Sequence, residues 1–229
     1  MERHFERELE ELKEQLLLMG GRAESIVLKA VESLRRLDED LARQVFADDK
    51  AIDRMEIDID DRCVRLLALQ QPMARDLRFI TAALKINNDL ERVGDHAVNI
   101  AGGALRLAGQ PLLKPLVDIP RMAALANGML HEALDAFVRR DAEAARALVV
   151  RDDEVDLLNQ QVFRELVSFM LEDPTTITRA TELILVARNL ERVADLATNV
   201  AEEVVFIAEA RVIKHHAEEA GPEGDFGRS

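Results

Sequence analysis

The feature that most limits what this chain can fold into is a twelve-residue segment that occurs twice, one hundred residues apart. Residues 90–101 read LERVGDHAVNIA and residues 190–201 read LERVADLATNVA, so that eight of the twelve positions are identical. Around the first copy, apolar residues recur at alternating steps of four and three from Phe79 to Leu107, and the second copy repeats this pattern. A sustained 3.5-residue period is typical of helices packed in a bundle. The sequence therefore predicts a repeated, all-α architecture.

Six helices can be placed along the chain from these apolar patterns and from the proline and glycine residues between them. Their predicted ranges are 2–37, 41–70, 74–108, 121–139, 141–171 and 178–215. The first is expected to run through the pair Gly20-Gly21, because its apolar pattern keeps its phase on both sides of the pair. Pro72 ends the second helix, since the residue before a proline is pushed out of the α region.

Two tandem three-helix bundles are therefore the predicted fold, with six long helices whose short connections make neighbours antiparallel. The predicted boundaries are 1–109 for the first bundle, 110–120 for a proline-rich connection, 121–215 for the second bundle and 216–229 for a polar tail. The tail has no apolar periodicity, so we expect it to be disordered.

The composition narrows the class of protein. The formal net charge of −14 makes the chain a poor binder of nucleic acid, because it would repel the phosphate backbone. With Cys63 as the one cysteine, no internal disulfide can form, and its place in an apolar helical pattern predicts a buried small hydrophobe. The charged N-terminus is unlike a secretory signal, and no apolar run approaches the ~20 residues that span a bilayer. We therefore expect a cytoplasmic protein without membrane insertion.

Each copy of the repeated segment carries acidic residues four positions apart. The first copy has Glu91 and Asp95, and the second has Glu191 and Asp195. Side chains at i and i+4 lie above one another on one face of a helix. Each copy therefore presents a column of two carboxylates, which an amide extends four residues later at Asn99 and Asn199.

A second acidic column lies on the helix before each copy. In the first half it contains Asp49, Asp53, Glu56 and Asp60, and its counterparts in the second half are Asp152, Asp156 and then Asn159. The apolar residues around the two columns match at an offset of 103, whereas the repeated segments match at an offset of 100. Each half therefore carries D-x-x-x-D on its second helix and E-x-x-x-D on its third.

Converging columns of like charge are unfavourable unless a cation lies between them. Carboxylates without cysteine or a required histidine form a hard, oxygen-rich site, for which iron(III) is favoured and manganese, magnesium, calcium or zinc are alternatives. The predicted metal ligands are Asp49, Asp53, Glu91, Asp95, Asp152, Asp156, Glu191 and Asp195, with Glu56, Asn99 and Asn199 as accessory residues. The alternative interpretation is that the columns are solvated helix faces. In a chain with 44 acids, chance alone supplies several i,i+4 acidic pairs, and most of these are solvated.

The residues next to the columns are expected to have structural roles. His96 points about 100° away from the column and has no counterpart in the second half, so we expect it to pack between helices and not to bind a metal. We expect Arg92 and Arg192 to form ion pairs with nearby acidic residues. The sequence shows no nucleophile–base constellation, no G-x-x-x-x-G-K loop and no Cys-pair zinc spacing, so it offers no positive case for an enzyme.

Two stretches together resemble the PhoU family of phosphate-uptake regulators. They are QPMARDLR at 71–78 and the doubled E-R-x-x-D of the repeated segments, and the resemblance covers the chain from about Leu9 to Ala210. Departures from the family pattern are Leu196, Asn159 and Phe206, which put equal metal loading of the two halves in doubt.

The resemblance implies a cytoplasmic, non-catalytic protein that represses the phosphate-starvation response when phosphate is plentiful. Its expected partners are the ATPase subunit of the phosphate ABC transporter and a sensor histidine kinase, and a homodimer is expected. It also implies metal clusters at the E/D-x-x-x-D motifs. Two alternatives stay open: a carboxylate-bridged protein for metal storage or di-metal catalysis, and a plain helical adaptor. The E-x-x-H that the di-metal enzyme design needs is absent from the sequence.

Overall fold

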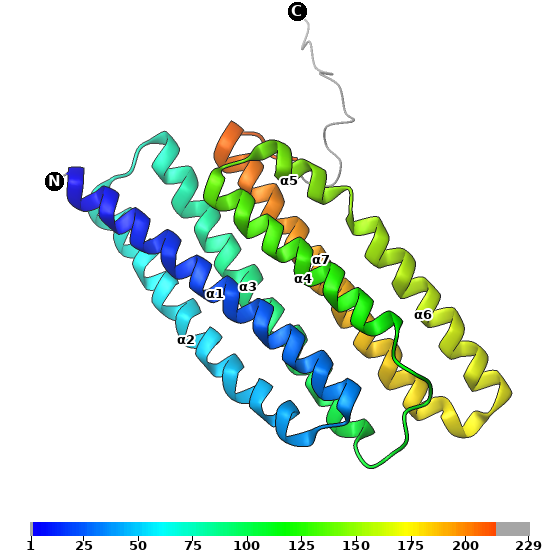
Figure 1. Cartoon of the computed structure of the whole chain (residues 1–229). Coiled ribbons are helices and arrows are strands. Elements are labelled where there is room, and N and C mark those ends of the chain that lie inside the picture. The colour runs from blue at the N-terminus through cyan, green and yellow to red at the C-terminus, as the bar shows by residue number, and fades with distance from the viewer. Residues whose placement is uncertain (1, 214–229) are drawn as a thin grey trace, which may run out of the picture.

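The protein is a bundle of long helices that lie side by side (Figure 1). The computed structural model describes residues 2–213, with side chains from His4 onward. The first unit consists of α1 (Glu2–Arg36), α2 (Glu39–Gln70) and α3 (Ala74–Leu107). The second consists of α4 (Asp118–Arg139), α5 (Ala142–Val149), α6 (Asp152–Glu172), the 3₁₀ turn η1 (Pro174–Thr176) and α7 (Ile177–Glu209).

The predicted all-α fold class is confirmed. Residues 2–213 contain no strand, and the helices in this range follow one another as two antiparallel units. None of the described helices is both long enough and apolar enough to span a membrane. The predicted tail, 216–229, lies outside the described residues.

In both units the second helical segment begins with an aspartate N-cap. Asp38 caps α2 by accepting a hydrogen bond from the backbone N–H of Leu41 at 2.9 Å. Asp141 caps α5 by accepting from the backbone N–H of Ala144 at 3.0 Å. An aspartate that satisfies a free N–H at a helix start stabilises the helix by about 1 kcal/mol. The offset of 103 between these caps is the offset of the acidic columns.

Helix α1 runs without interruption through Gly20 and Gly21, as predicted. The two glycines differ in their surroundings. A Cβ at Gly20 would clash with the side chain of Leu134 on α4, whereas a Cβ at Gly21 would meet nothing within 4 Å. Gly20 therefore allows α1 of the first unit to pack closely against α4 of the second.

The predicted fifth helix, 141–171, is in fact two helices. Between α5 and α6, the N–H of Arg151 donates to the carbonyl of Leu148 at 2.9 Å, and the N–H of Glu154 donates to the carbonyl of Arg151 at 3.1 Å. These i→i−3 bonds tighten the chain into a turn between the two helices. The exposed Val150 lies at this turn.

The predicted sixth helix also ends earlier than expected, at Glu209 instead of 215. Ala210 adopts a left-handed conformation with φ of 59° and donates its N–H to the carbonyl of Phe206 at 3.0 Å. A left-handed residue directly after the last turn is a common way to end a helix. The last apolar position of the repeated pattern, Ile207, lies in this final turn.

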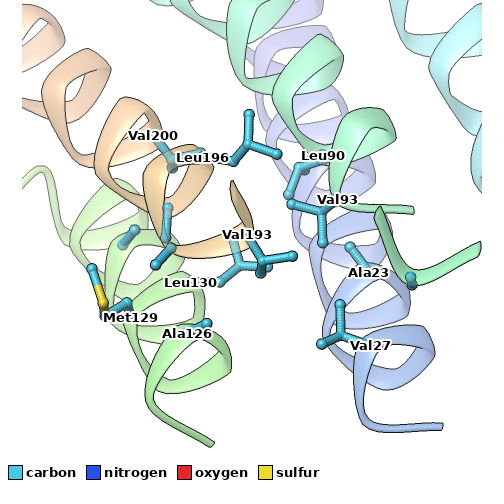
Figure 2. Close-up of a cluster of buried hydrophobic side chains, with 14 of the residues drawn as sticks. Ala23, Val27, Leu90, Val93, Ala126, Met129, Leu130, Val193, Leu196 and Val200 are labelled. Carbon is cyan, nitrogen blue, oxygen red and sulfur yellow. The ribbon is translucent and has the colours of Figure 1, made fainter. Parts of the chain in front are cut away.

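The two units share one hydrophobic core, because α3 packs against α7 and α1 packs against α4. Figure 2 shows where the four helices meet. The side chains labelled there are Ala23 and Val27 of α1, Leu90 and Val93 of α3, Ala126, Met129 and Leu130 of α4, and Val193, Leu196 and Val200 of α7. Each fully buried Leu or Val contributes roughly 1.5–3 kcal/mol relative to an exposed one. Cys63 is buried in the same core, as predicted, and burial raises the pKa of its thiol to about 12.

Helices α3 and α7 run antiparallel, and ion pairs join them on both sides of the centre. Lys85 donates to Glu203 at 3.0 Å towards one end, and Arg106 lies 2.8 Å from Glu182 towards the other. The midpoint between these pairs falls within the repeated segments. The two copies therefore pack against each other at the centre of the molecule.

Candidate functional site

The first acidic column lies between α2 and α3. Its members are Asp49, Asp53 and Glu56 from α2 and Glu91 and Asp95 from α3, all partly buried except the exposed Asp95. The two helices approach closely at Gly94, where a Cβ would stand 2.6 Å from Oδ1 of Asp49. The absence of a side chain at Gly94 therefore allows the Asp49 carboxylate to lie against α3.

The pKa values show that the first column is electrostatically coupled across the two helices. Burial, followed by the charges of Asp53 and Asp95, raises the pKa of Asp49 to about 6. Burial also raises the pKa of Glu91 to about 7, with Asp95 and then Glu56, Asp53 and Asp49 as further causes. Like charges within a few ångströms favour the neutral form of each carboxyl. The structure thus places the four residues that the sequence singled out in this half on neighbouring helices, within electrostatic reach of one another.

The second column lies between α6 and α7 and repeats this arrangement. Burial, then Asp195, Asp156 and Glu191, raise the pKa of Asp152 to about 6. The pKa of Asp156 is raised by burial and by Asp195, and that of Glu191 by burial and by Asp195, against the opposing charge of Arg192. The four predicted residues of the second half therefore lie on two neighbouring helices, within electrostatic reach of one another.

The turn between α5 and α6 makes Asp152 the first residue of α6. One of its carboxylate oxygens, Oδ1, is buried and accepts no hydrogen bond. A buried oxygen without a donor costs free energy that a bound cation would recover. This oxygen and the all-oxygen donor set fit a hard metal ion in the second column.

The carboxylates have the chemistry of metal ligands, but their side chains are not arranged as a ligand set. Within residues 4–213, no group of three or more His, Cys, Asp or Glu side chains is arranged so that it could hold a metal ion. Carboxylates that repel one another keep apart, so a cation would have to draw them together by side-chain rotation. The predicted metal ligation therefore stays a prediction, supported by the donor chemistry and not by the present geometry.

The three accessory residues differ in position. Glu56 belongs to the first column, since burial, Asp60 and Asp53 raise its pKa. Asn99 lies exposed on α3. Asn199 lines a groove of about 480 Å³ beside the second column, together with Asp152 and Asp195.

The first half also contributes a residue to this groove. Arg92 of α3 lines it, opposite the carboxylates of α6 and α7. No motif in the sequence indicates this proximity, because it depends on how α3 packs against α7.

The neighbours of the columns have the structural roles that the sequence predicts. Nδ1 of His96 donates to Oδ1 of Asn189 on α7 at 2.9 Å, so this histidine packs between helices. Arg92 pairs with Asp89 at 3.5 Å, and Arg192 pairs with Asp195 at 2.9 Å. The predicted local ion pairs are confirmed, although their partners are aspartates three residues away.

Fold and site together define a class of protein: an all-α chain of two repeated units, each with a carboxylate column between its second long helix and its last. The PhoU domain family matches residues 16–103 and 119–204, so one copy falls in each unit. The chain therefore belongs to the PhoU family.

Named relatives and solved structures agree with this assignment. The chain is 44% identical over 216 residues to a phosphate-specific transport system accessory protein PhoU homolog of Aquifex aeolicus, covering 94% of this chain and 98% of the relative. It is 34% identical over 211 residues to the corresponding Escherichia coli protein, with 92% and 88% covered.

Two crystal structures share the fold. That of PhoU from Pseudomonas aeruginosa superimposes with a TM-score of 0.87 at 40% identity, covering 90% of this chain and all of that one. That of the phosphate transport system regulatory protein PhoU from Streptococcus pneumoniae gives a TM-score of 0.85 at 30% identity, with 92% and 99% covered.

Proposed function

We propose that this protein regulates phosphate uptake by binding other proteins and not by catalysis. The observation that carries the proposal is the match of both halves to the PhoU domain, each with its acidic column. Relatives that match along nearly their whole length are named accessory proteins of the phosphate-specific transport system. In the proposed role the protein represses the phosphate-starvation response when phosphate is plentiful. It acts in the cytoplasm, as a homodimer, between the ATPase subunit of the phosphate ABC transporter and a sensor histidine kinase.

The proposal includes a metal ion at each column. Asp49, Asp53, Glu91 and Asp95 would hold the first. The second would be held by Asp152, Asp156, Glu191 and Asp195. A hard cation, for which iron(III) is favoured, would supply positive charge that neutralises the mutual repulsion of the carboxylates. The metals would then stabilise the two outer helices, α2 and α6, against α3 and α7.

The charge of the molecule favours basic partner surfaces. A net charge of −14 steers association with a positively charged face, and salt weakens such association. Binding alone does not regulate a partner, because a ligand with equal affinity for both states of the partner leaves the equilibrium between them unchanged. The protein is therefore proposed to prefer the non-phosphorylating state of the kinase.

The regulatory role is tested in a bacterial strain from which the gene for this protein has been deleted. We expect alkaline phosphatase to be produced constitutively in phosphate-rich medium, and the wild-type gene to restore repression. The Asp95→Asn/Asp195→Asn variant should restore repression poorly, because the metal ions are proposed to be part of the signalling-competent protein. If the deletion leaves repression intact, the regulatory role is wrong. If the double variant represses as well as the wild type, the plain-adaptor alternative is favoured.

The kinase as a direct partner is tested separately with purified proteins. Titrating this protein into a kinase autophosphorylation assay should lower phosphorylation, with a smaller effect at higher salt. Unchanged phosphorylation and no complex at low salt would leave the transporter as the direct target.

A further inference from the structure

The residues that line a groove beside the second carboxylate column differ in charge from their equivalents in the first half. A groove of about 540 Å³ lies between α6 and α7, lined by Asn159, Gln160, Phe163, Arg164, Ile184, Arg188, Glu191 and Arg192. The offsets of 103 and 100 identify the equivalent first-half residues as Glu56, Ile57, Asp60, Asp61, Leu84, Asn88, Glu91 and Arg92. Glu56, Asp60 and Asp61 of the first half thus correspond to Asn159, Phe163 and Arg164 of the second. Asn88 corresponds to Arg188.

The change is coordinated across the two helices. In the first half, the amide nitrogen of Asn87 donates to Oδ1 of Asp60 at 2.8 Å and to the carbonyl of Glu56 at 2.9 Å. In the second half the equivalent pair is Ala187 and Phe163, so a hydrogen bond between side chains is replaced by two apolar groups. Asp60 thereby accepts a hydrogen bond within the protein, whereas Phe163 is 52% exposed and lines the groove.

The arginines of the second groove are available to a ligand. Arg164 on α6 and Arg188 on α7 are exposed and line the groove, and the charge of Arg188 also acts on Glu191 in the same groove. Arg192, by contrast, is held by Asp195. The lining of the groove therefore contains three arginines, Arg164, Arg188 and Arg192, against one glutamate, Glu191.

We propose that the α6–α7 groove binds a small organic phosphate, with the phosphoryl group on Arg164 and Arg188 and a ring of the ligand on Phe163. A guanidinium presents a planar set of donors that matches phosphoryl oxygens in pairs. An exposed aromatic ring offers a face on which a base can stack. The amides of Asn159 and Gln160 add donors and acceptors at the rim of the groove. The volume lies within the range of small-molecule sites.

The equivalent face of the first half does not suit the same ligand. Its acids would repel a phosphoryl group, and it has no arginine at the position of Arg188. The two halves would therefore differ in function beside similar carboxylate columns. This site needs neither the metals nor the partner proteins, so its test is independent of the proposed regulatory role.

The test is calorimetric titration of the full-length protein with AMP and, separately, with inorganic phosphate, both in the presence of a chelator. We expect AMP to bind more tightly than phosphate. Arg164→Gln/Arg188→Gln should lower the affinity for both by at least about tenfold. Phe163→Ala should lower the affinity for AMP and leave that for phosphate unchanged. The matched control is Arg22→Gln/Arg139→Gln, which removes two exposed arginines elsewhere and makes the same change in net charge.

Circular dichroism confirms that each variant is folded before titration. The proposal is overturned if the wild type binds neither ligand, or if the control variant loses as much affinity as the groove variant. Equal affinities for AMP and phosphate, both insensitive to Phe163→Ala, would retain the phosphoryl site and overturn the organic part of the ligand.

Discussion

At the scale of single residues, Glu91 makes the stability of the metal-free protein depend on pH. Its pKa is raised from 4.5 to about 7, chiefly by burial, so the unfolded chain ionises first as the pH rises. The folded state therefore loses stability between about pH 4.5 and about pH 7, where the unfolded chain holds fewer protons. Thermal unfolding in chelator should show this loss, and Glu91→Gln should reduce it.

The control for this prediction is Glu14→Gln, at an exposed glutamate of α1. It should leave the pH dependence of the melting temperature as it is in the wild type. An equally steep pH dependence in Glu91→Gln would show that burial of this carboxyl has no effect on stability.

Gly94 is the second residue whose replacement is informative. In a helix interior, Gly→Ala ordinarily stabilises by about 1 kcal/mol. At Gly94 the added Cβ would stand 2.6 Å from Oδ1 of Asp49, so the carboxylate must move and most of this gain should be lost. Gly128→Ala on α4, where a Cβ meets nothing within 4 Å, should show the full gain in urea unfolding. Equal gains in both variants would contradict the close approach of α2 to α3.

The sequence predicted the acids of the columns but not this glycine contact. Residue type and i,i+4 spacing mark Glu91 and Asp95 directly, because both are local properties of one helix. The role of Gly94 depends on the distance between two helices, and the second half has Ala194 at the equivalent position. The change of charge at Arg164 and Arg188 has no sequence signal for a related reason, because the repeat is defined by the positions that both halves keep.

At the scale of helices, the adjacent glycines of α1 form a matched pair. Gly21→Ala should stabilise the protein by about 1 kcal/mol, because the added Cβ points into open space. Gly20→Ala should be less stable than Gly21→Ala, because Leu134 is buried and must shift to avoid the new Cβ. Urea unfolding of the two variants compares them directly. If Gly20→Ala is as stable as Gly21→Ala, α1 and α4 do not pack as closely as the structure shows.

Helices with a continuous apolar pattern could be predicted closely from the sequence. Helix α3, predicted as 74–108, spans Ala74–Leu107. The division between α5 and α6 could not be predicted, because the turn at Val150 and Arg151 contains neither glycine nor proline. It arises from a local tightening of backbone hydrogen bonds, for which the side chains give no signal.

At the scale of the whole molecule, the shared core predicts that both halves unfold together. Helices α3 and α7 bury apolar residues from both units in one cluster, and the ion pair of Lys85 with the buried Glu203 joins the same two helices. Thermal unfolding followed by calorimetry and by circular dichroism should therefore give a single coincident transition. Two separated transitions would show that the repeats fold as independent domains.

The repeat in the sequence predicts two similar units, since each apolar pattern must be buried against another helix. It does not specify that α3 and α7 lie antiparallel with the repeated segments at the centre. That arrangement also determines why Arg92 of the first half reaches the groove of the second. It follows from contacts between residues about one hundred positions apart, which a periodic pattern does not encode.

The proposal that each carboxylate column holds a metal ion is tested most directly by manganese and iron titration with elemental analysis of the purified protein. We expect wild type to bind metal in both halves, Asp95→Asn and Asp195→Asn each to lose binding in one half, and the double variant to lose both. Asp58→Asn/Asp135→Asn, at exposed aspartates outside the columns, is the control with the same change in charge and should bind as wild type does. Equal metal binding by the wild type and the Asp95→Asn/Asp195→Asn variant would show that the columns are solvated helix faces.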